Sequence, residues 1–383
     1  MTKIVLAPDS FKGSLSAPQA CAALEAGLRR VWPDADIRAR PMADGGEGTL
    51  DAILHAVGTD ATRATMALPG ASGTMRDAHY GLLREGGGSV AVIEVAEIVG
   101  LTDAAAVRTD VGARTTTGIG ILVRALLDRG VREFRIGLGG SSTNDGGAGL
   151  LRALGVALVD ANGAPVEPTV DGLATLAAVD ASGVDPRLVD ARIAILSDVN
   201  NPLCGTVGAT AVFGPQKGVT PQRIAAFDAT LARFAALAEQ AFGRAAAGNP
   251  GSGAAGGLGF ALQLLGGTMA SGAEVVADLV KLDAALADAD WAITGEGRTD
   301  AQTLLDKAPF VVARRARRAG VPVTLVSGAV DAASLATLAG HFAGCFALPP
   351  GPATLDDCIG HAADWLADRA AEVARARSAL RRT

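Results

Sequence analysis

Apolar and polar positions follow two different spacings near the start of the chain. The apolar run at residues 3–7 is typical of a short buried β-strand. Ser16 and Gln19 then have the spacing of a capping box, which predicts a helix with Leu24 and Leu28 on its apolar face. Residues 37–42, interpreted as a second strand, and a helical stretch that stops at Gly58 repeat this arrangement. The pattern therefore predicts two successive strand–helix units.

The middle of the chain differs, and the last third returns to the opening pattern. Between residues 59 and 101 the apolar runs are β-like and are separated by glycine-rich turns. Further on, Pro221 after Thr220 predicts the start of a long helix. The other expected strands are residues 134–138, 158–160, 193–196, 291–294, 323–326 and 343–348, and the other helices are residues 119–127, 310–318 and 358–373. This alternation predicts an α/β fold with mainly parallel sheets.

The length of the chain and the likeness of its two ends predict two α/β domains, one inserted into the other. At 383 residues the chain is longer than one hydrophobic core usually accommodates. We expect residues 1–58 and 288–383 to form a discontinuous domain of the Rossmann or flavodoxin-like type. Residues 59–287 are expected to form the inserted second α/β domain.

Composition and charge argue against several classes of partner. The formal net charge is −6 and no basic block occurs, so neither nucleic acid nor a membrane is an expected partner. The uncharged stretch 245–273 is rich in glycine, which predicts a loop and a buried helix instead of a membrane span. Four scattered cysteines without a CxxC pair argue against zinc or disulfides. The scattered cysteines and an N-terminus unlike a signal peptide indicate a cytoplasmic protein. We expect the protein to be a monomer or a homodimer.

Five loops after predicted strands combine glycine with acids, hydroxyls or lysine. Such loops are candidate sites because ligands bind outside the carboxyl ends of parallel strands. The first, residues 7–14, contains Asp9, Ser10 and Lys12. The second, residues 43–48, contains Asp44 and Glu47. These two acids are suited to a metal–phosphate complex or a substrate hydroxyl, or else Asp44 caps the following helix with Glu47 in its first turn.

The other three loops lie in the middle and the last third of the chain. Residues 139–147 place small polar groups suited to phosphate oxygens and Mg²⁺ between glycine pairs, namely Gly140, Ser141, Ser142, Thr143, Asn144 and Asp145. Asp198 follows strand 193–196 as a candidate base or metal ligand, and Lys217 is a candidate phosphate clamp. An Asx turn and an exposed lysine are the structural alternatives for these two. The fifth loop, 294–300, contributes Gly295, Glu296 and Asp300.

Several other signals lack the context that their function requires. Residues 251–256 match G-x-G-x-x-G but follow a predicted helix instead of a strand, which argues against a dinucleotide fold. The sequence contains no P-loop, no protein-kinase signature and no G-x-S-x-G elbow. The four histidines are dispersed, so surface or packing roles are expected for them.

At the five loops the sequence closely resembles the bacterial glycerate kinase family of type 1. The matching strings are APDSFKGS at 7–14, ADGGEG at 43–48, GGSSTNDGG at 139–147, FGPQKG at 213–218 and TGEGRTD at 294–300. The resemblance implies two α/β domains with an active-site cleft between them. It also implies MgATP as donor, D-glycerate as acceptor and 2-phosphoglycerate as the usual product. The segment 115–118 is shorter than the hydroxyl-rich string of that family.

Phosphoryl transfer needs positioning, charge neutralisation and a base, and the loops supply these residue types. We expect Lys12 to hold the carboxylate of glycerate and Asp198 to act as the base, with Asp300 as the next catalytic candidate. Substrate contacts are expected from Asp9, Ser10, Lys12, Asp44 and Glu47. Nucleotide contacts are expected from residues 140–144 together with Lys217, Gly295 and Glu296. The candidate Mg²⁺ ligands are Asp145, Asp198 and Glu296.

Two other functions compete with this interpretation. A non-catalytic sensor of sugar acids on a degenerate kinase fold would keep the binding loops and lose the acids, whereas the acids are present here. A kinase for a related hydroxy acid, such as tartronate, would share all five loops.

Overall fold

The computed structural model describes residues 1–380, and these residues form two compact units. Unit 1 contains Met1–Gly58 and the chain from Ser271 onward, and unit 2 contains Thr59–Ala270. The second crossing between the units is thus at Ala270–Ser271, whereas the sequence predicted it near residue 288. The difference arises because α10 (Gly272–Leu279) and α11 (Leu282–Leu286) pack against α12 (Ala308–Arg318), and α10 also packs against α2 (Thr49–Val57).

Unit 1 is built on a five-stranded sheet in the order β15-β13-β11-β1-β2, in which every neighbouring pair is parallel. The strands are β1 (Lys3–Leu6), β2 (Asp36–Ala39), β11 (Trp291–Thr294), β13 (Val323–Ser327) and β15 (Gly344–Ala347). The short strands β12 (Arg298–Thr299) and β14 (Ala329–Val330) pair separately. The other helices are α1 (Ala17–Arg29), α13 (Leu335–Leu338), α14 (Leu355–Gly360) and α15 (Ala362–Leu380), with 3-10 turns at Gly58–Asp60, Ala301–Leu304 and Ala332–Ser334.

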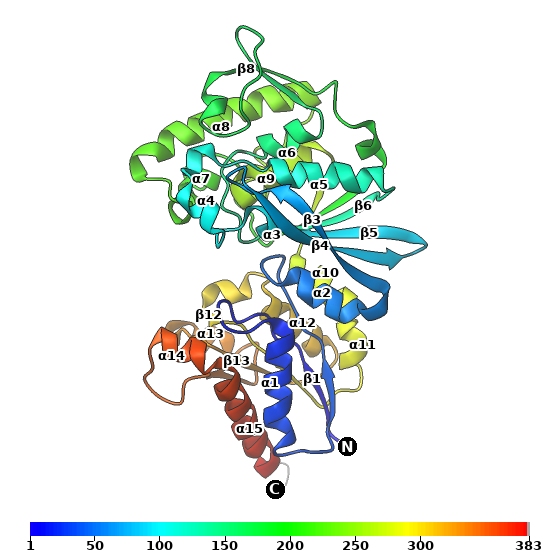
Figure 1. Ribbon diagram of the computed structural model, residues 1–383. Helices are drawn as coiled ribbons and strands as arrows, with labels where there is room; N and C mark the ends of the chain where they lie inside the picture. The colour runs from blue at the N-terminus through cyan, green and yellow to red at the C-terminus, as the bar shows by residue number, and fades with distance from the viewer. Residues whose placement is uncertain (381–383) are drawn as a thin grey trace. The chain divides into compact units, whose positions relative to one another are not determined.

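Local sequence explains the first helix of unit 1. Ser16 accepts a hydrogen bond from the amide of Gln19, whose side chain accepts one from the amide of Ser16, so the predicted capping box is confirmed. Leu24 and Leu28 are buried, as predicted, in a core that also contains Ile4, Trp291 and Leu366. Helix α15 lies beside α1 (Figure 1).

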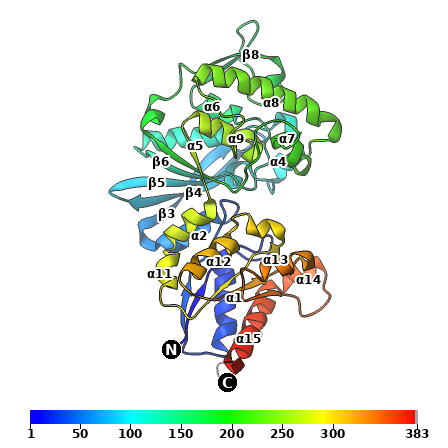
Figure 2. The same ribbon diagram turned by 180° about the vertical axis from the view of Figure 1, so that it is seen from behind.

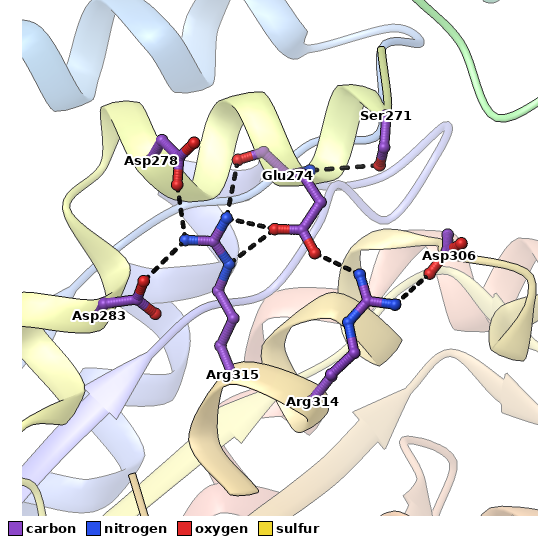
Figure 3. A network of polar contacts seen from close by, with 7 residues as sticks. All are labelled: Ser271, Glu274, Asp278, Asp283, Asp306, Arg314 and Arg315. Atoms are coloured by element: carbon purple, nitrogen blue, oxygen red, sulfur yellow. Dashed lines mark hydrogen bonds and ion pairs between the residues drawn. The ribbon is translucent and has the colours of Figure 1, made fainter. Parts of the chain in front are cut away.

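An ion-pair network joins α12 to α10 and α11 (Figure 3). Arg315 is buried and contacts the Glu274 carboxylate, Asp278 at 2.7 Å and Asp283 at 3.1 Å. The neighbouring Arg314 contacts Glu274 and, at 2.6 Å, Asp306. Burial favours the neutral form of Glu274, but hydrogen bonds from the two arginines outweigh it and hold the pKa of this carboxyl below its usual value. The network fixes α10 against the body of unit 1.

Unit 2 contains a six-stranded sheet in the order β10-β9-β6-β5-β4-β3. The strands are β3 (Ala61–Pro69), β4 (Met75–Glu85), β5 (Gly88–Glu94), β6 (Glu133–Gly137), β9 (Arg192–Leu196) and β10 (Thr268–Ala270), of which β5, β6, β9 and β10 are mutually parallel. A hairpin of β7 (Ala157–Asp160) and β8 (Leu176–Asp180) is separate. The helices are α3 (Ala96–Val99), α4 (Ala104–Arg108), α5 (Thr117–Asp128), α6 (Ala148–Ala153), α7 (Ala209–Phe213), α8 (Pro221–Phe242) and α9 (Ala254–Leu264), with 3-10 turns at Val111–Ala113, Gly172–Thr175, Pro186–Asp190 and Pro215–Lys217.

The interior of unit 2 is one apolar core. Helices α5, α6 and α9 pack together beside the strands (Figure 2), and α8 contributes Phe227, Leu231 and Phe234 to the core. The stretch 245–273 forms a loop and the buried helix α9, as the sequence predicted, and it also contains strand β10 and the start of α10, which were not predicted. No helix within residues 1–380 combines the length and apolarity that crossing a membrane requires.

The predicted α/β fold with mainly parallel sheets is confirmed, and one helix prediction is wrong. Strand β3 lies in the region expected to be β-like but was not singled out, because most of its side chains are exposed or half-buried. The single closing helix predicted at residues 358–373 is two helices that meet at His361.

Candidate active site

The strand order of unit 1 reverses between β1 and β11, and this switch point positions three of the five loops. In parallel α/β sheets the crevice at such a point, outside the carboxyl ends of the strands, is where ligands bind. The amide of Asp9, after β1, donates to Gly295 O, after β11, at 2.8 Å. Thr294 Oγ1 donates to Ala7 O at 2.7 Å, which ties the two strand ends together.

Four charged side chains of unit 1 interact at this edge. Asp9 is 5% exposed, and burial raises the pKa of its carboxyl well above the ordinary value, as does the negative charge of Asp44. Lys12 is exposed, and the charges of Asp44, Asp9 and Glu47 raise its pKa. A site with one cation among several acids holds an anion through the lysine and hydroxyl groups through the acids.

The loop 43–48 does not cap its helix in the way the structural alternative required. The residue at the N-cap of α2 is Gly48, so Asp44 does not occupy the capping position. The carboxylate of Asp44 instead accepts from the Gly46 amide at 3.1 Å, within its own loop, and Glu47 is exposed. Both acids are therefore available to a ligand.

Glu296 and Asp300 have different surroundings in the fifth loop. Glu296 is 7% exposed, and burial raises its pKa, while Oε1 accepts from Thr299 at 2.9 Å and Thr303 at 2.6 Å. Because both of these bonds go to Oε1, Oε2 remains for a metal or a hydroxyl. Asp300 caps the 3-10 turn at Ala301–Leu304 and accepts from the Gln302 amide at 2.8 Å. This capping bond argues against a catalytic role for Asp300.

Gly295 has a structural reason to be glycine. A Cβ at this position would overlap the carbonyl oxygen of Val326 in the neighbouring strand β13. Close packing at the end of β11 therefore explains this residue without a nucleotide contact.

In unit 2, loop 139–147 is organised by a buried carboxylate. Asp145 is 0% exposed and accepts from the amide and hydroxyl of Thr116, both at 2.8 Å, and from the amides of Gly147 and Gly149 at 3.0 and 3.2 Å. Burial raises its pKa against the opposing effect of these bonds. Three of the four bonds go to Oδ2, so the carboxylate is committed to holding its own loop. This geometry argues against the predicted role of Asp145 as a metal ligand.

Lys217 lies under the same loop and is 4% exposed, so the exposed-lysine alternative is wrong. Its ammonium group donates to Thr143 O at 2.7 Å and Ser141 Oγ at 3.2 Å. Burial lowers its pKa to about 7. The guanidinium of Arg114, which the sequence analysis did not single out, donates to Ser142 O and Lys217 O at 3.0 Å each.

The loop also contains buried polar atoms that find no partner among residues 1–380, namely Thr143 Oγ1 and Asn144 Oδ1. Both side chains are fully buried, and the other end of the Asn144 amide donates to Thr210 Oγ1 at 3.0 Å. Buried polar groups are rarely left unsatisfied, so these two atoms indicate a ligand. Ser142 Oγ, by contrast, donates to Val99 O at 2.9 Å and serves the loop itself.

Asp198 lies close to this loop because their strands are neighbours. Residues 139–147 follow β6 and Asp198 follows β9, and these parallel strands pair through Gly137 and Leu196. Asp198 is half-buried. Strand β5, on the other side of β6, ends in the buried carboxyl residue Glu94. Nothing in the sequence singles out Glu94, because no glycine-rich polar motif surrounds it.

The predicted site residues thus form two groups, one in each unit. Asp9, Lys12, Asp44, Glu47 and Glu296 share the switch point of unit 1, and Ser10 adds a hydroxyl oxygen that is buried without a partner in the described chain. Loop 139–147, Lys217 and Asp198 share the sheet edge of unit 2. Among residues 1–380, no group of three or more histidine, cysteine, aspartate or glutamate side chains is arranged to hold a metal ion.

Comparison with known proteins gives one consistent result. The model of the glycerate kinase family matches residues 4–378. The chain is 41% identical to a glycerate kinase of Bacillus subtilis (strain 168), over 97% of each protein. It is also 41% identical to glycerate 2-kinase of Escherichia coli (strain K12), over 86% of this chain and 85% of that protein. A crystal structure described as glycerate kinase 2 from Salmonella typhimurium LT2 aligns over 100% of both chains, with a TM-score of 0.84 and 41% identity.

Proposed function

This chain belongs to the glycerate kinase family and is a kinase, and from this premise we propose that it transfers the γ-phosphoryl group of ATP to D-glycerate, giving ADP and 2-phosphoglycerate. The observation that carries the proposal is the similarity to glycerate kinases along the whole chain, including a glycerate 2-kinase. The two groups of polar side chains supply what a transfer between two anionic substrates requires.

The switch-point group of unit 1 is assigned to glycerate. Lys12 pairs with the substrate carboxylate, and the surrounding acids keep this lysine charged. Asp9, the pKa of which burial raises, is placed to form a hydrogen bond with the substrate, and Asp44 and Glu47 accept from the substrate hydroxyls. Ser10 Oγ supplies a further hydrogen bond.

Loop 139–147 and Lys217 are assigned to the nucleotide. Thr143 Oγ1 is a donor for a phosphate oxygen, Asn144 Oδ1 is an acceptor for a nucleotide hydroxyl, and Gly140 and Ser141 contribute the backbone around them. Asp145 and Arg114 hold this loop and Lys217 in place through buried hydrogen bonds. Their role is positioning, which dominates phosphoryl transfer.

The residues present fit Mg²⁺ bound mainly through substrate phosphates. Mg²⁺ usually takes one or two carboxylates from a protein and completes its shell with phosphate oxygens and water, so no larger acidic cluster is needed. Glu296, through Oε2, is the carboxylate of unit 1 that would hold it. When bound, the ion neutralises the charge that develops on the transferred phosphoryl group.

Asp198 is proposed as the base that takes the proton from the attacking hydroxyl of glycerate. It follows β9, directly beside the loop assigned to the nucleotide. Removing a general base typically lowers the rate by about 10²- to 10⁴-fold. Asp198→Asn should therefore lower kcat by at least about 10²-fold in a folded protein, whereas Asp9→Asn, which imitates a protonated carboxyl, should retain most of kcat. The reverse outcome would make Asp9 the base.

The assay measures ADP release by purified protein with Mg²⁺ and ATP, with and without D-glycerate. We expect glycerate-dependent turnover, with tartronate and L-glycerate poorer acceptors. Phosphorus NMR of the product identifies the reacting oxygen, since phosphate on the 2-hydroxyl couples to one proton and phosphate on the 3-hydroxyl couples to two. ADP release that does not depend on glycerate would refute the proposal, and a triplet would refute the assignment of the product.

A further inference from the structure

Unit 1 contains a cavity of about 200 Å³ that includes none of the residues assigned to either substrate. Three basic side chains line it: Arg40 just after β2, His55 near the end of α2, and Lys281 just after α10. None of the lining residues is acidic. We propose that this cavity binds a small phosphate-bearing anion.

The arginine of the cavity is incompletely satisfied within the described chain. Arg40 Nη1 donates to Ala39 O at 2.7 Å, but Arg40 Nε is buried and has no hydrogen-bond partner among residues 1–380. A buried donor of this kind is rarely left without a partner. Arginine and lysine are also the residues that most often bind phosphate, the first through its planar fork and the second as a compact charge.

The helix ends at the cavity account for only part of the positive charge. Helices α2 and α10 both end there, and each C-terminus carries a partial charge equivalent to about −0.5. Helix α11 begins there with Lys281 as its N-cap, and its N-terminus carries about +0.5, so the three helix ends together offset about half a positive charge. Arg40 and Lys281 carry two positive charges, and this excess suits an anion.

The size of the cavity and the backbone at Lys281 are consistent with a small ligand. At about 200 Å³ the cavity is smaller than the sites of drug-sized ligands, which start near roughly 300 Å³. Lys281 has a φ of 53°, in the left-handed region that favours glycine. This conformation places a lysine at a turn where a residue without a side chain would be sterically preferred.

The test uses inorganic phosphate as the probe and His55 as the reporter. The full-length protein is labelled at histidine Cε1 and titrated at constant pH and ionic strength, with chloride as the reference salt, and His55→Gln assigns the signal. We expect phosphate to shift the His55 signal with saturation and to leave His79, His341 and His361 unchanged. Phosphate bound only in the nucleotide or glycerate site would leave His55 unchanged as well, because neither proposed site contains a histidine.

Two variants and a control decide whether the cavity is responsible. Losing one charged hydrogen bond should weaken phosphate binding at His55 about tenfold or more in Arg40→Gln and in Lys281→Gln. Arg318→Gln removes an exposed arginine elsewhere in unit 1 and should leave the titration unchanged. A His55 signal that does not saturate, that responds equally to chloride, or that titrates alike in all variants would overturn the proposal.

Discussion

Among single residues, Lys217 links burial, charge and ligand binding most directly. Its pKa is lowered to about 7 because the ammonium group is buried, so at pH 8 most of the free protein has a neutral Lys217. Unfolding restores the ordinary pKa near 10.5. The unfolded chain therefore binds one more proton between about pH 7 and pH 10.5, and this residue makes the free protein more stable as the pH rises through that window.

Nucleotide binding should reverse this effect. A phosphate close to Lys217 favours its charged form and raises its pKa, so ADP binding at pH 8 should take up close to one proton. Calorimetry in buffers of different ionisation enthalpy measures this number. At pH 6, where Lys217 is already protonated, uptake through this residue should be small. The control is Lys217→Met, and equal proton uptake in that variant at pH 8 would show that Lys217 does not contact the nucleotide.

The sequence predicts which residues are polar at strand ends, but not what each of them does. Asp145 and Asp198 look alike as acids in loops after strands. Only the structure shows that Thr116, far away in the sequence, uses the carboxylate of Asp145 to hold the loop. Arg114 directly precedes segment 115–118, but nothing in that segment predicts that its guanidinium donates to Ser142 O and Lys217 O. The low pKa of Lys217 likewise depends on burial by distant segments.

At the level of elements, α10 is placed to position the loop of Asp44. Its first residue, Gly272, lies against this loop so closely that a Cβ would overlap the carbonyl oxygen of Asp44. The ion-pair network of Arg315 and Glu274 holds the same helix against α12 (Figure 3). Because the ion pairs hold the helix, the loop is the part that must move when their contact is disturbed.

Gly272→Ala should therefore impair glycerate binding selectively. The added methyl group forces the Asp44 loop to move, and displacements of about 1 Å at a site can cost up to about 10²-fold in activity. We expect the KM for glycerate to rise about tenfold or more, while the KM for ATP changes little. Gly360→Ala is the matched control, because no atom lies within 4 Å of the Cβ that it adds. Equal increases in both KM values would indicate general damage instead.

The elements also show where sequence patterns stop being informative. Strands β1, β9 and β11 were predictable because each is a short buried apolar run. Their order in the sheets was not, since β11 pairs with β1 across an insertion of more than two hundred residues. The switch point that gathers Asp9 and Glu296 depends on that pairing. Periodicity therefore could not predict that these two residues lie at the same edge of the sheet.

For the whole molecule, the two units differ in how the chain builds them. Unit 2 is one continuous segment with its own apolar core, and the chain enters and leaves it next to β3 and β10, the two edge strands of its sheet. Unit 1 needs both ends of the chain, because β11 lies between β1 and β13. A continuous segment with a complete core can in principle fold alone.

We therefore predict that the segment 59–270 folds in isolation. It should show a cooperative urea transition and retain proton-linked ADP binding, because Lys217, Arg114, Asp145 and loop 139–147 all belong to it. Circular dichroism and calorimetry provide the measurements. The comparison is the fragment 1–270, whose first 58 residues supply only β1 and β2 of a five-stranded sheet and should remain unfolded.

A segment 59–270 without a cooperative transition would show that the core of unit 2 requires unit 1. A folded segment that fails to bind ADP would instead place essential nucleotide contacts, such as those predicted for Glu296, in unit 1.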